Sequence, residues 1–173
     1  MTEASHVGDL VTRLALSHPE VSFRFINNGQ VKLHTSGNGN LKDVIYHIYG
    51  REIASNLIEV DFERKGIHIT GYLGKPLISR GNRNFENYFV DGRYIKSSII
   101  SKAIEDGYKD FTMQHKYPFV VLYLDVDTEH VDVNVHPTKM DVRFNNQQEI
   151  YNTLFAAVDD GLHERELIPE VTL

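Results

Sequence analysis

Apolar and polar side chains alternate over short segments through much of the chain, which is the pattern of half-buried β-strands. Three pairs of such segments are each separated by a short turn that ends in glycine, a strong signal for a β-hairpin. The turns are Asn27-Asn28-Gly29, Lys65-Gly66 and Asp91-Gly92, between predicted strands at 21–25 and 31–33, 57–63 and 67–72, and 87–90 and 93–95. A nearly continuous apolar run at 119–126 predicts a central strand covered on both faces.

Apolar residues at helical spacing predict four helices, which span 5–17, 41–49, 97–105 and 149–162. Ser5 is the expected N-cap of the first helix and Pro19 marks its end, while Gly50 closes the second helix. In the first helix the residues at helical spacing are Val7, Leu10, Val11 and Leu14. In the other three helices the residues expected to face the core are Val44, Ile45, Ile48, Ile99, Ile100, Ala103, Ile104, Ile150, Leu154, Phe155, Val158 and Leu162. Hairpins and helices in this order indicate an α+β fold, with a mixed sheet and helices packed on it.

The stretch Ser36-Gly37-Asn38-Gly39-Asn40 interrupts this pattern and predicts a flexible joint. We therefore expect the chain to divide into residues 1–36 and residues 37–173. The Gly-x-Gly of the joint does not match a phosphate-binding loop, because no Gly-Lys-Ser/Thr follows it.

Composition is that of an ordinary globular protein, with 41% hydrophobic and 24% charged residues. The absence of cysteine excludes disulfides, thiolate metal sites and a cysteine nucleophile. No apolar run approaches the roughly 20 residues of a membrane-spanning helix. The spacing of the nine histidines fits no metal-binding motif, and we predict no metal site. Four acids surround one strand connection, where a solvated turn is favoured and a magnesium site is the alternative: Asp125, Asp127, Glu129 and Asp132.

The formal net charge of −6 is unevenly distributed along the chain. Residues 75–102 carry six bases against Glu86 and Asp91, a local excess of four positive charges. Five of these bases are candidates for salt-dependent, sequence-independent contacts with a DNA backbone: Arg80, Arg83, Arg93, Lys96 and Lys102. A solvated helix face is the alternative interpretation, and the acidic chain as a whole argues against a dedicated nucleic-acid binder.

Residues 131–144 contain two short alternating segments on either side of a proline corner. Pro137 has a fixed φ and biases His136 toward an extended conformation, so we expect a stiff corner in which His136 orders the turn by bonding to nearby backbone. Lys139 follows the corner at the start of the second segment. A rigidly presented ammonium group is suited to binding phosphate as a point charge. A plain hairpin with one exposed lysine is the alternative.

Three parts of the chain resemble the MutL mismatch-repair family in the family's order. The signature is Val131-Asp132-Val133-Asn134-Val135-His136-Pro137-Thr138-Lys139, followed by Val142-Arg143-Phe144. The earlier segments are Leu14-Ala15-Leu16, His18-Pro19 and Asn28-Gly29, and then Asn82-Arg83 and Phe89-Val90-Asp91-Gly92-Arg93. Asp91 stands where the family usually has asparagine, and both residues suit a tight turn.

The resemblance implies a fold like domain 2 of ribosomal protein S5 for residues 37–173, which would form a transducer domain. Residues 1–36 would be the C-terminal helix and hairpin of the upstream ATPase domain, or the hinge beside it. That GHKL-type domain, whose motifs are absent from this sequence and expected before Met1, would hold ATP and Mg. Lys139 would reach the γ-phosphate as the catalytic and nucleotide-binding residue. The basic stretch would contribute to a DNA-binding groove.

The resemblance also implies partners and a location. The expected partners are the upstream ATPase domain of the same chain, DNA bound weakly and non-specifically, the mismatch-recognition protein MutS and a second copy in a homodimer. We expect no membrane partner, and a location in the bacterial cytoplasm with the nucleoid. This chain alone is expected to hold no cofactor and to be inactive as an ATPase.

The alternative function is a stand-alone nucleic-acid-binding module with an S5-like fold. Such a module would be indifferent to Lys139, whereas the ATPase interpretation needs its ammonium group. The ATPase interpretation also predicts an exposed apolar patch near residues 1–36, where the upstream domain would pack.

Overall fold

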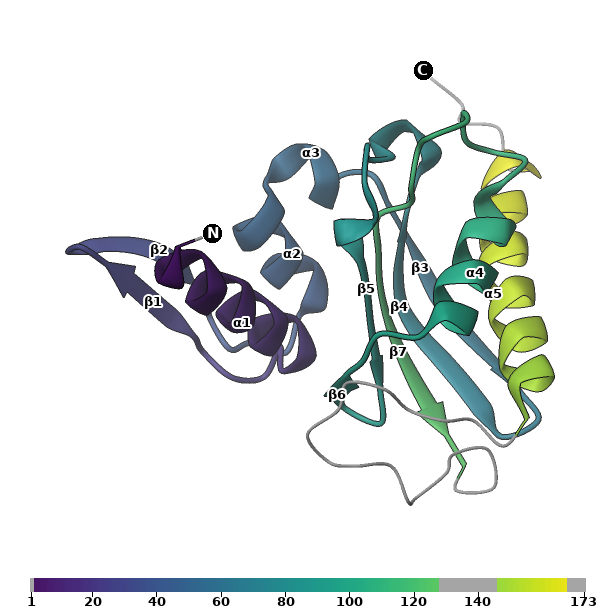
Figure 1. Ribbon diagram of the computed structural model, residues 1–173, viewed down its shortest axis with the longest axis horizontal. Helices are drawn as coiled ribbons and strands as arrows, with labels where there is room; N and C mark the ends of the chain where they lie inside the picture. Colours follow the sequence, from purple (N-terminus) through teal and green to yellow (C-terminus); the bar gives the residue numbers. More distant parts are fainter. Residues whose placement is uncertain (1, 128–145, 168–173) are drawn as a thin grey trace. The chain divides into compact units, whose positions relative to one another are not determined.

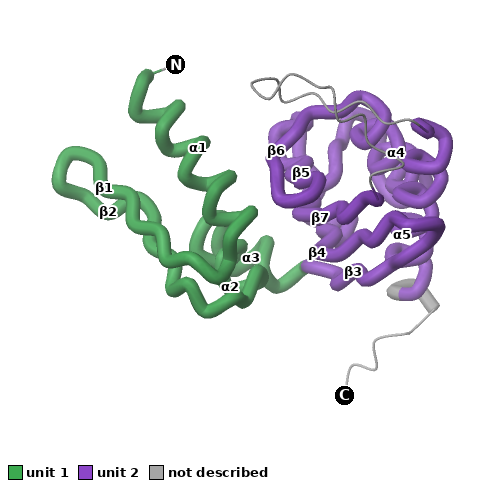
Figure 2. Tube along the Cα trace, turned by 90° about the horizontal axis from the view of Figure 1, so that it is seen from below, with its two compact units in different colours: residues 1–56 green, residues 57–173 purple. Residues whose placement is uncertain are grey.

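The computed structural model describes residues 2–127 and 146–167 of the chain (Figure 1). The chain divides into two compact units, Met1–Asn56 and Leu57–Leu173, which we call unit 1 and unit 2 (Figure 2). The division falls after residue 56 and not at the glycine-containing joint, because the helix after the joint packs on the first helix and the first hairpin. The assignment of residues 1–36 to an upstream domain stays a prediction.

Unit 1 consists of a helix, a hairpin and two further helices. Its elements are α1 (Glu3–Ser17), β1 (Arg24–Asn27), β2 (Gln30–His34), α2 (Leu41–Tyr49) and α3 (Arg51–Ala54). α1 begins earlier than predicted because Thr2, and not Ser5, is its N-cap: the Thr2 hydroxyl accepts a hydrogen bond from the Ser5 amide at 3.3 Å. α2 has the predicted bounds and ends at Gly50, whose φ is 93°. α3 has four residues, too few for a periodic pattern, and sequence analysis missed it.

The three predicted hairpins are confirmed. In each turn both central residues have positive φ, as in the type I′ turns that match the twist of paired strands. These residues are Asn28 and Gly29, Lys65 and Gly66, and Asp91 and Gly92. β1 starts at Arg24, later than predicted, because a side chain holds the preceding residues: the Thr35 hydroxyl accepts a hydrogen bond from the Phe23 amide at 2.8 Å.

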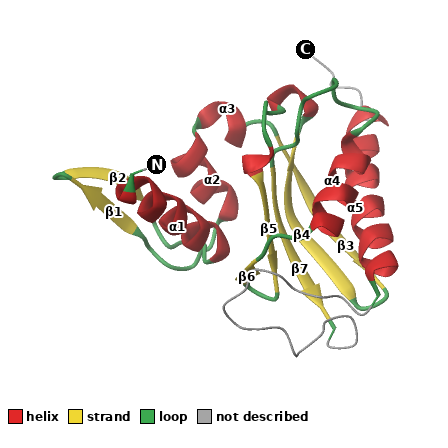
Figure 3. Ribbon diagram, viewed as in Figure 1, coloured by secondary structure: helices red, strands yellow, loops and turns green. Residues whose placement is uncertain are grey.

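Unit 2 is a five-stranded mixed sheet with two long helices on one face (Figure 3). Its elements are β3 (Leu57–Arg64), β4 (Ile67–Gly74), the 3-10 helices η1 (Pro76–Ile78) and η2 (Arg83–Phe85), β5 (Glu86–Val90), β6 (Arg93–Tyr94), α4 (Ser98–Tyr108), β7 (Val120–Val126) and α5 (Gln147–Leu167). The strand order is β3-β4-β7-β5-β6, in which β5 and β7 are parallel and the other neighbours are antiparallel. The predicted α+β class is therefore confirmed, with β7 as the middle strand.

The core of unit 2 lies between the sheet and the helices α4 and α5. Its fully buried side chains include Ile67, Ile69, Leu73, Ile100, Ile104, Val120, Leu122, Ile150, Leu154 and Val158. β7 is covered less completely than predicted on its other face, where Tyr123 is half-buried and Asp125 is exposed. Both helices extend beyond their predicted ends, and no described helix has the length and apolar character needed to cross a bilayer.

The end of α4 is tied to the end of β4 by one buried hydrogen bond. The Tyr108 hydroxyl donates to the Gly74 carbonyl at 2.6 Å, and Tyr108 is almost fully buried. Because a buried polar group needs a partner, this contact satisfies the Tyr108 hydroxyl and joins the ends of the two elements. The loops that follow them are joined in turn by paired backbone hydrogen bonds between Arg80 and Tyr117, each of 2.7 Å.

Candidate functional site

The proline corner lies outside the described residues. Lys139, His136 and Pro137 all belong to the segment that connects β7 to α5. Their predicted roles at a nucleotide and in the turn therefore stay predictions. Glu129 and Asp132 lie in the same segment. Among the residues that the structure does describe, no three histidine or acidic side chains are arranged to hold a metal ion.

The bases between residues 75 and 102 do not form a single cluster. Arg80 and Arg83 precede β5, whereas Arg93 and Lys96 follow it. A strand of five residues is about 16 Å long, so β5 separates the two pairs. Lys102 lies on α4. The contiguous basic stretch of the sequence thus becomes two small basic patches at opposite ends of one strand.

Two of the five candidate DNA-binding residues are engaged in ion pairs with α4. Arg83 donates from Nε to Glu105 at 2.9 Å, and its guanidinium lies 4.6 Å from the centre of the Tyr117 ring. The Glu105 hydrogen bond raises the pKa of Arg83. Lys102 Nζ lies 3.0 Å from Asp106 one turn further along the helix. Such exposed pairs are weak, so a phosphate would compete with them readily.

A group of buried polar atoms lies near the start of β5. The Glu86 side chain is only 8% exposed, and neither carboxyl oxygen has a hydrogen-bond partner among the described residues. Burial, assisted by the Glu105 carboxylate, raises the pKa of Glu86 to about 8. The Ser79 hydroxyl and the Arg80 Nε are also buried without a partner in the described part of the chain. Sequence analysis missed this group, whose signal is a glutamate at the start of an otherwise uncharged strand.

The sheet face opposite α4 and α5 is acidic along β3, β4 and β7. The register places Glu63 beside His68 and His68 beside Asp125 on this face. His68 Nε2 also lies 2.6 Å from Asp61. The hydrogen bond with Asp61 raises the pKa of His68, and the neighbouring carboxylates add to the effect. This part of the sheet would repel a phosphate backbone, so DNA contacts are not expected there.

Unit 1 exposes several of the apolar side chains that lie at helical spacing along α1. Val7, Leu10 and Leu14 follow one another along one side of α1 and are 41%, 55% and 39% exposed. The buried residues of α1 are instead Ala15 and Leu16. The apolar spacing of the first helix therefore marks an exposed side of α1, because unit 1 has too few residues to cover both sides of the helix.

The hairpin of unit 1 repeats this exposure. Ile26 and Val31 are direct partners across β1 and β2, and they are 50% and 49% exposed. Val21, just before β1, is 43% exposed. The exposed apolar side chains expected near residues 1–36 are therefore present on both the helix and the hairpin. We call Val7, Leu10, Leu14, Ile26 and Val31 the apolar face of unit 1.

The fold is similar to domains found in DNA repair proteins. A crystal structure of the N-terminal domain of a DNA repair protein matches 94% of this chain and 54% of its own chain, with a TM-score of 0.77 and 21% identity. The ATPase domain of the bacterial mismatch repair endonuclease Aquifex aeolicus MutL matches 89% of this chain and 51% of its own, with a TM-score of 0.57 and 18% identity. At these identities the likeness shows the fold alone, which agrees with the expected S5 domain 2-like class.

Sequence comparison identifies the family. The model of the DNA mismatch repair protein, C-terminal domain, matches residues 45–163. The chain is 59% identical over 170 residues to DNA mismatch repair protein MutL of Agathobacter rectalis, and 44% identical over 160 residues to that of Clostridium acetobutylicum. These matches cover 98% and 92% of this chain and 26% of each relative. The chain therefore belongs to the MutL family of DNA mismatch repair proteins, and it spans about a quarter of these relatives' length.

Proposed function

We propose that this chain is the transducer part of a MutL-type ATPase, in which Lys139 reaches the γ-phosphate of ATP held by an upstream domain. The observation that carries the proposal is the apolar face of unit 1. Five large apolar side chains stand exposed there on a helix and a two-stranded hairpin. A hairpin of two strands is marginally stable by itself, and an extended apolar surface usually marks a contact with another domain.

The proposed partner on this face is the upstream ATPase domain of the same chain. The solved Aquifex aeolicus MutL ATPase domain is about twice as long as the part that this chain matches, which leaves room for such a domain. ATP and Mg would be held in that upstream domain. Apolar burial along α1 and the hairpin would attach unit 1 to it, and unit 2 would carry Lys139 toward the nucleotide.

In this arrangement Lys139 has an electrostatic role. Phosphoryl transfer depends mainly on positioning and on stabilising the charge of the terminal phosphate, which an ammonium group supplies without exchanging a proton. Because the lysine comes from outside the nucleotide-binding domain, it binds well only while the γ-phosphate is present. ATP would then favour the docked arrangement and hydrolysis would release it, which makes the contact a switch.

The proposed link to DNA uses the bases on either side of β5 and on α4. Arg80, Arg83, Arg93, Lys96 and Lys102 would contact the phosphate backbone without reading its sequence. The ion pairs of Arg83 and Lys102 would open or be shared when phosphate binds, so their contribution is smaller than the charge count suggests. MutS and a second copy of the protein are further proposed partners in the mismatch-repair context of the family.

The test is steady-state ATP hydrolysis by a longer chain with the upstream domain restored, comparing Lys139→Ala with the parent. We expect a loss on the order of a hundredfold in kcat with nucleotide still bound, the usual scale for one electrostatic stabiliser. Lys116→Ala is the matched control, because Lys116 is an exposed lysine on a surface loop. An unchanged rate for Lys139→Ala would leave this lysine as a surface residue and overturn the proposal.

The 173-residue chain provides a second check. We expect calorimetry to detect no stoichiometric ATP binding by this chain, because the nucleotide site would lie in the upstream domain. Tight ATP binding by this chain alone would contradict the proposal that the upstream domain holds the nucleotide.

A further inference from the structure

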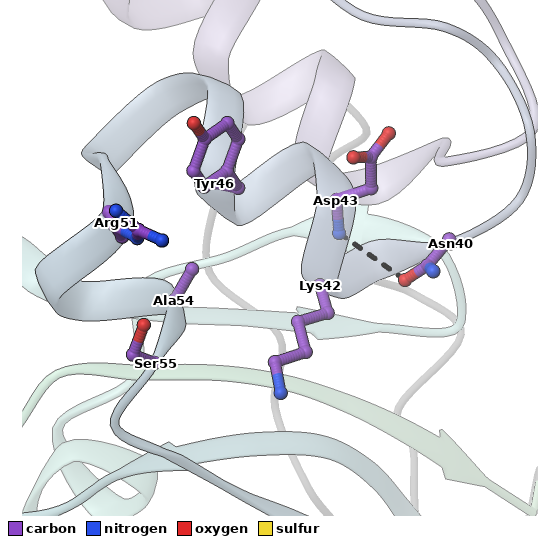
Figure 4. A pocket seen from close by; sticks show the side chains of 7 residues that line it. All are labelled: Asn40, Lys42, Asp43, Tyr46, Arg51, Ala54 and Ser55. Atoms are coloured by element: carbon purple, nitrogen blue, oxygen red, sulfur yellow. Dashed lines mark hydrogen bonds between the residues drawn. The ribbon is translucent and has the colours of Figure 1, made fainter.

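Unit 1 contains a groove between α2 and α3 that the charge pattern of the sequence did not reveal. Its volume is about 350 Å³, and Lys42, Tyr46, Arg51 and Ser55 line it (Figure 4). All four side chains are exposed. In Figure 4, Ser55 lies on the same side of the groove as Arg51, and Lys42 lies across from them. The two cations are nine residues apart in the sequence, and the two helices bring them to one groove.

The groove presents hydrogen-bond donors and positive charge. Within the described part of the chain, Lys42 and Arg51 form no ion pair. Among the same residues, the hydroxyl groups of Tyr46 and Ser55 form no hydrogen bond. Lysine and arginine offer donors only, which suits phosphate oxygens. The ligand that fits this set is an anion with several acceptor atoms.

The single carboxylate at the groove is already satisfied by its own neighbours. Asp43 Oδ2 accepts hydrogen bonds from the Ser36 hydroxyl at 3.2 Å and from the Asn38 amide at 3.3 Å. It also lies 3.7 Å from His47 Nε2. Its charge is therefore directed away from Lys42 and Arg51, and it would oppose an incoming anion only weakly.

The aromatic ring narrows the class of ligand. Tyr46 is 49% exposed, and the ring contact it makes is an edge contact with His47, with centroids 5.6 Å apart and planes at 78°. An exposed aromatic ring in the same groove as two cations is a combination by which proteins hold single-stranded nucleic acid: cations track the phosphates and the ring stacks on an unpaired base. A duplex offers phosphates but no free base face.

We propose that the α2–α3 groove binds single-stranded nucleic acid, with phosphates on Lys42 and Arg51 and one base stacked on Tyr46. The volume is at the low end of small-ligand sites, roughly 300–1,000 Å³, and matches a nucleotide-sized group. The groove is independent of Lys139 and of the bases around β5. A failure of the nucleotide role proposed above would leave this site untouched, and the reverse also holds.

The test is fluorescence anisotropy of a labelled oligothymidylate with the 173-residue chain at two salt concentrations. Combined Lys42→Ala and Arg51→Ala substitutions are expected to weaken binding about tenfold or more and to lower the salt slope by about 1.4, since each single-strand phosphate contact contributes about 0.7. Tyr46→Ala is expected to lose about tenfold, the scale of one stacked base, whereas Tyr46→Phe retains the ring and the affinity.

The matched control removes two exposed lysines elsewhere, Lys32→Ala with Lys116→Ala, and should leave binding within about twofold. An equal loss of affinity in this control would show that binding depends only on the overall charge of the chain, and it would overturn the proposed site. Equal affinity for duplex and single strand, with no effect of Tyr46→Ala, would overturn the stacking contact and leave a phosphate site. Competition by millimolar inorganic phosphate alone would overturn the claim that a polynucleotide is the ligand. Circular dichroism of each variant confirms that the substitutions leave the fold intact.

Discussion

Unit 2 covers its apolar side chains and unit 1 does not. The exposed large apolar residues of unit 1 are Val7, Leu10, Leu14, Val21, Ile26, Val31 and Tyr46, whereas those of the described part of unit 2 are Leu77 and Met113. Unit 2 builds a two-layer structure, in which a sheet and a pair of helices enclose one core. Unit 1 has short elements and only a few fully buried residues. The difference indicates that unit 2 encloses its own core, whereas unit 1 leaves an apolar surface uncovered.

The largest effect is expected from Gly71→Ala, which tests the packing of unit 2 at its tightest point. Gly71 has φ 123°, and an added Cβ would lie 2.1 Å from the Val121 carbonyl oxygen on the central strand. Neither the backbone conformation nor the contact suits an L-residue, so we expect the free energy of unfolding to fall by about 4 kcal/mol. Urea denaturation measures it.

The control for this glycine is Gly81→Ala. No atom lies within 4 Å of a Cβ built there, and its φ is outside the left-handed region. The free energy of unfolding of Gly81→Ala should stay within about 0.5 kcal/mol of that of the parent. If both variants lost similar amounts of free energy of unfolding, the close approach of β4 and β7 would not explain the effect of Gly71→Ala.

The second prediction compares one residue type in the two units. Leu122→Ala removes a side chain with no exposure from the middle of the sheet, and we expect it to lower the free energy of unfolding by about 3 kcal/mol. Leu10→Ala removes a side chain that is 55% exposed, and should change it by about 0.5 kcal/mol at most.

Restoring the upstream domain would sharpen this comparison. If the apolar face of unit 1 packs against that domain, Leu10→Ala should become destabilising by about 1–2 kcal/mol in the longer chain, because the leucine is then buried. An equally small effect in both chains would count against the proposed contact. The measurement is thermal denaturation of the parent and of Leu10→Ala, each in the 173-residue chain and in the longer chain.

The last prediction concerns Glu86, whose effect appears as a pH dependence. Its folded pKa of about 8 lies above the ordinary value of 4.5, so the folded state holds a proton that the unfolded state releases. The stability that protonated Glu86 contributes is fully present below about pH 4.5 and declines as the pH rises toward and through 8. Glu86→Gln removes this dependence and should gain about 2 kcal/mol on the parent between pH 5 and pH 9.

Melting temperatures of both proteins at pH 5, 7 and 9 would test the Glu86 prediction. Parallel curves for the parent and Glu86→Gln would show that this carboxyl titrates normally and is therefore hydrated. His68 gives a contrasting signature on the opposite face of the sheet. Its raised pKa stabilises the fold at low pH and the benefit disappears as the pH rises through that value, but the exposed position makes it small.

Local pattern was a good guide to the elements of this protein and a poor guide to its surfaces. Type I′ turns need positive φ at two adjacent residues, which Asn28-Gly29 and Asp91-Gly92 allow, so the hairpins followed from the residues themselves. Element ends were less predictable. Thr2 and Ser5 are both good caps, and only the chain path decides which of them meets a free amide. The family was predictable too, because its signature strings are contiguous.

The candidate sites depended on contacts between distant residues. Six bases within 28 residues of sequence were divided by β5 into separate patches, and Arg83 was paired with Glu105 across the fold. The groove of Lys42 and Arg51 arises only where α3 turns back beside α2, and α3 itself carried no periodic signal. Glu86 is buried at the start of β5, beside Val120 of β7, a position that only the pairing of these two distant strands creates.

The sequence by itself determined the hairpins, most helices, the α+β class and the family of this protein, because each rests on residues that are neighbours along the chain. The tertiary structure alone decided which apolar side chains are covered, which charges are paired and which polar groups lose water. These properties depend on the distance between elements and on the solvent that packing excludes. Val7 and Ile100 have similar apolar side chains at helical spacing, and only the presence of a second layer makes one of them core and leaves the other exposed.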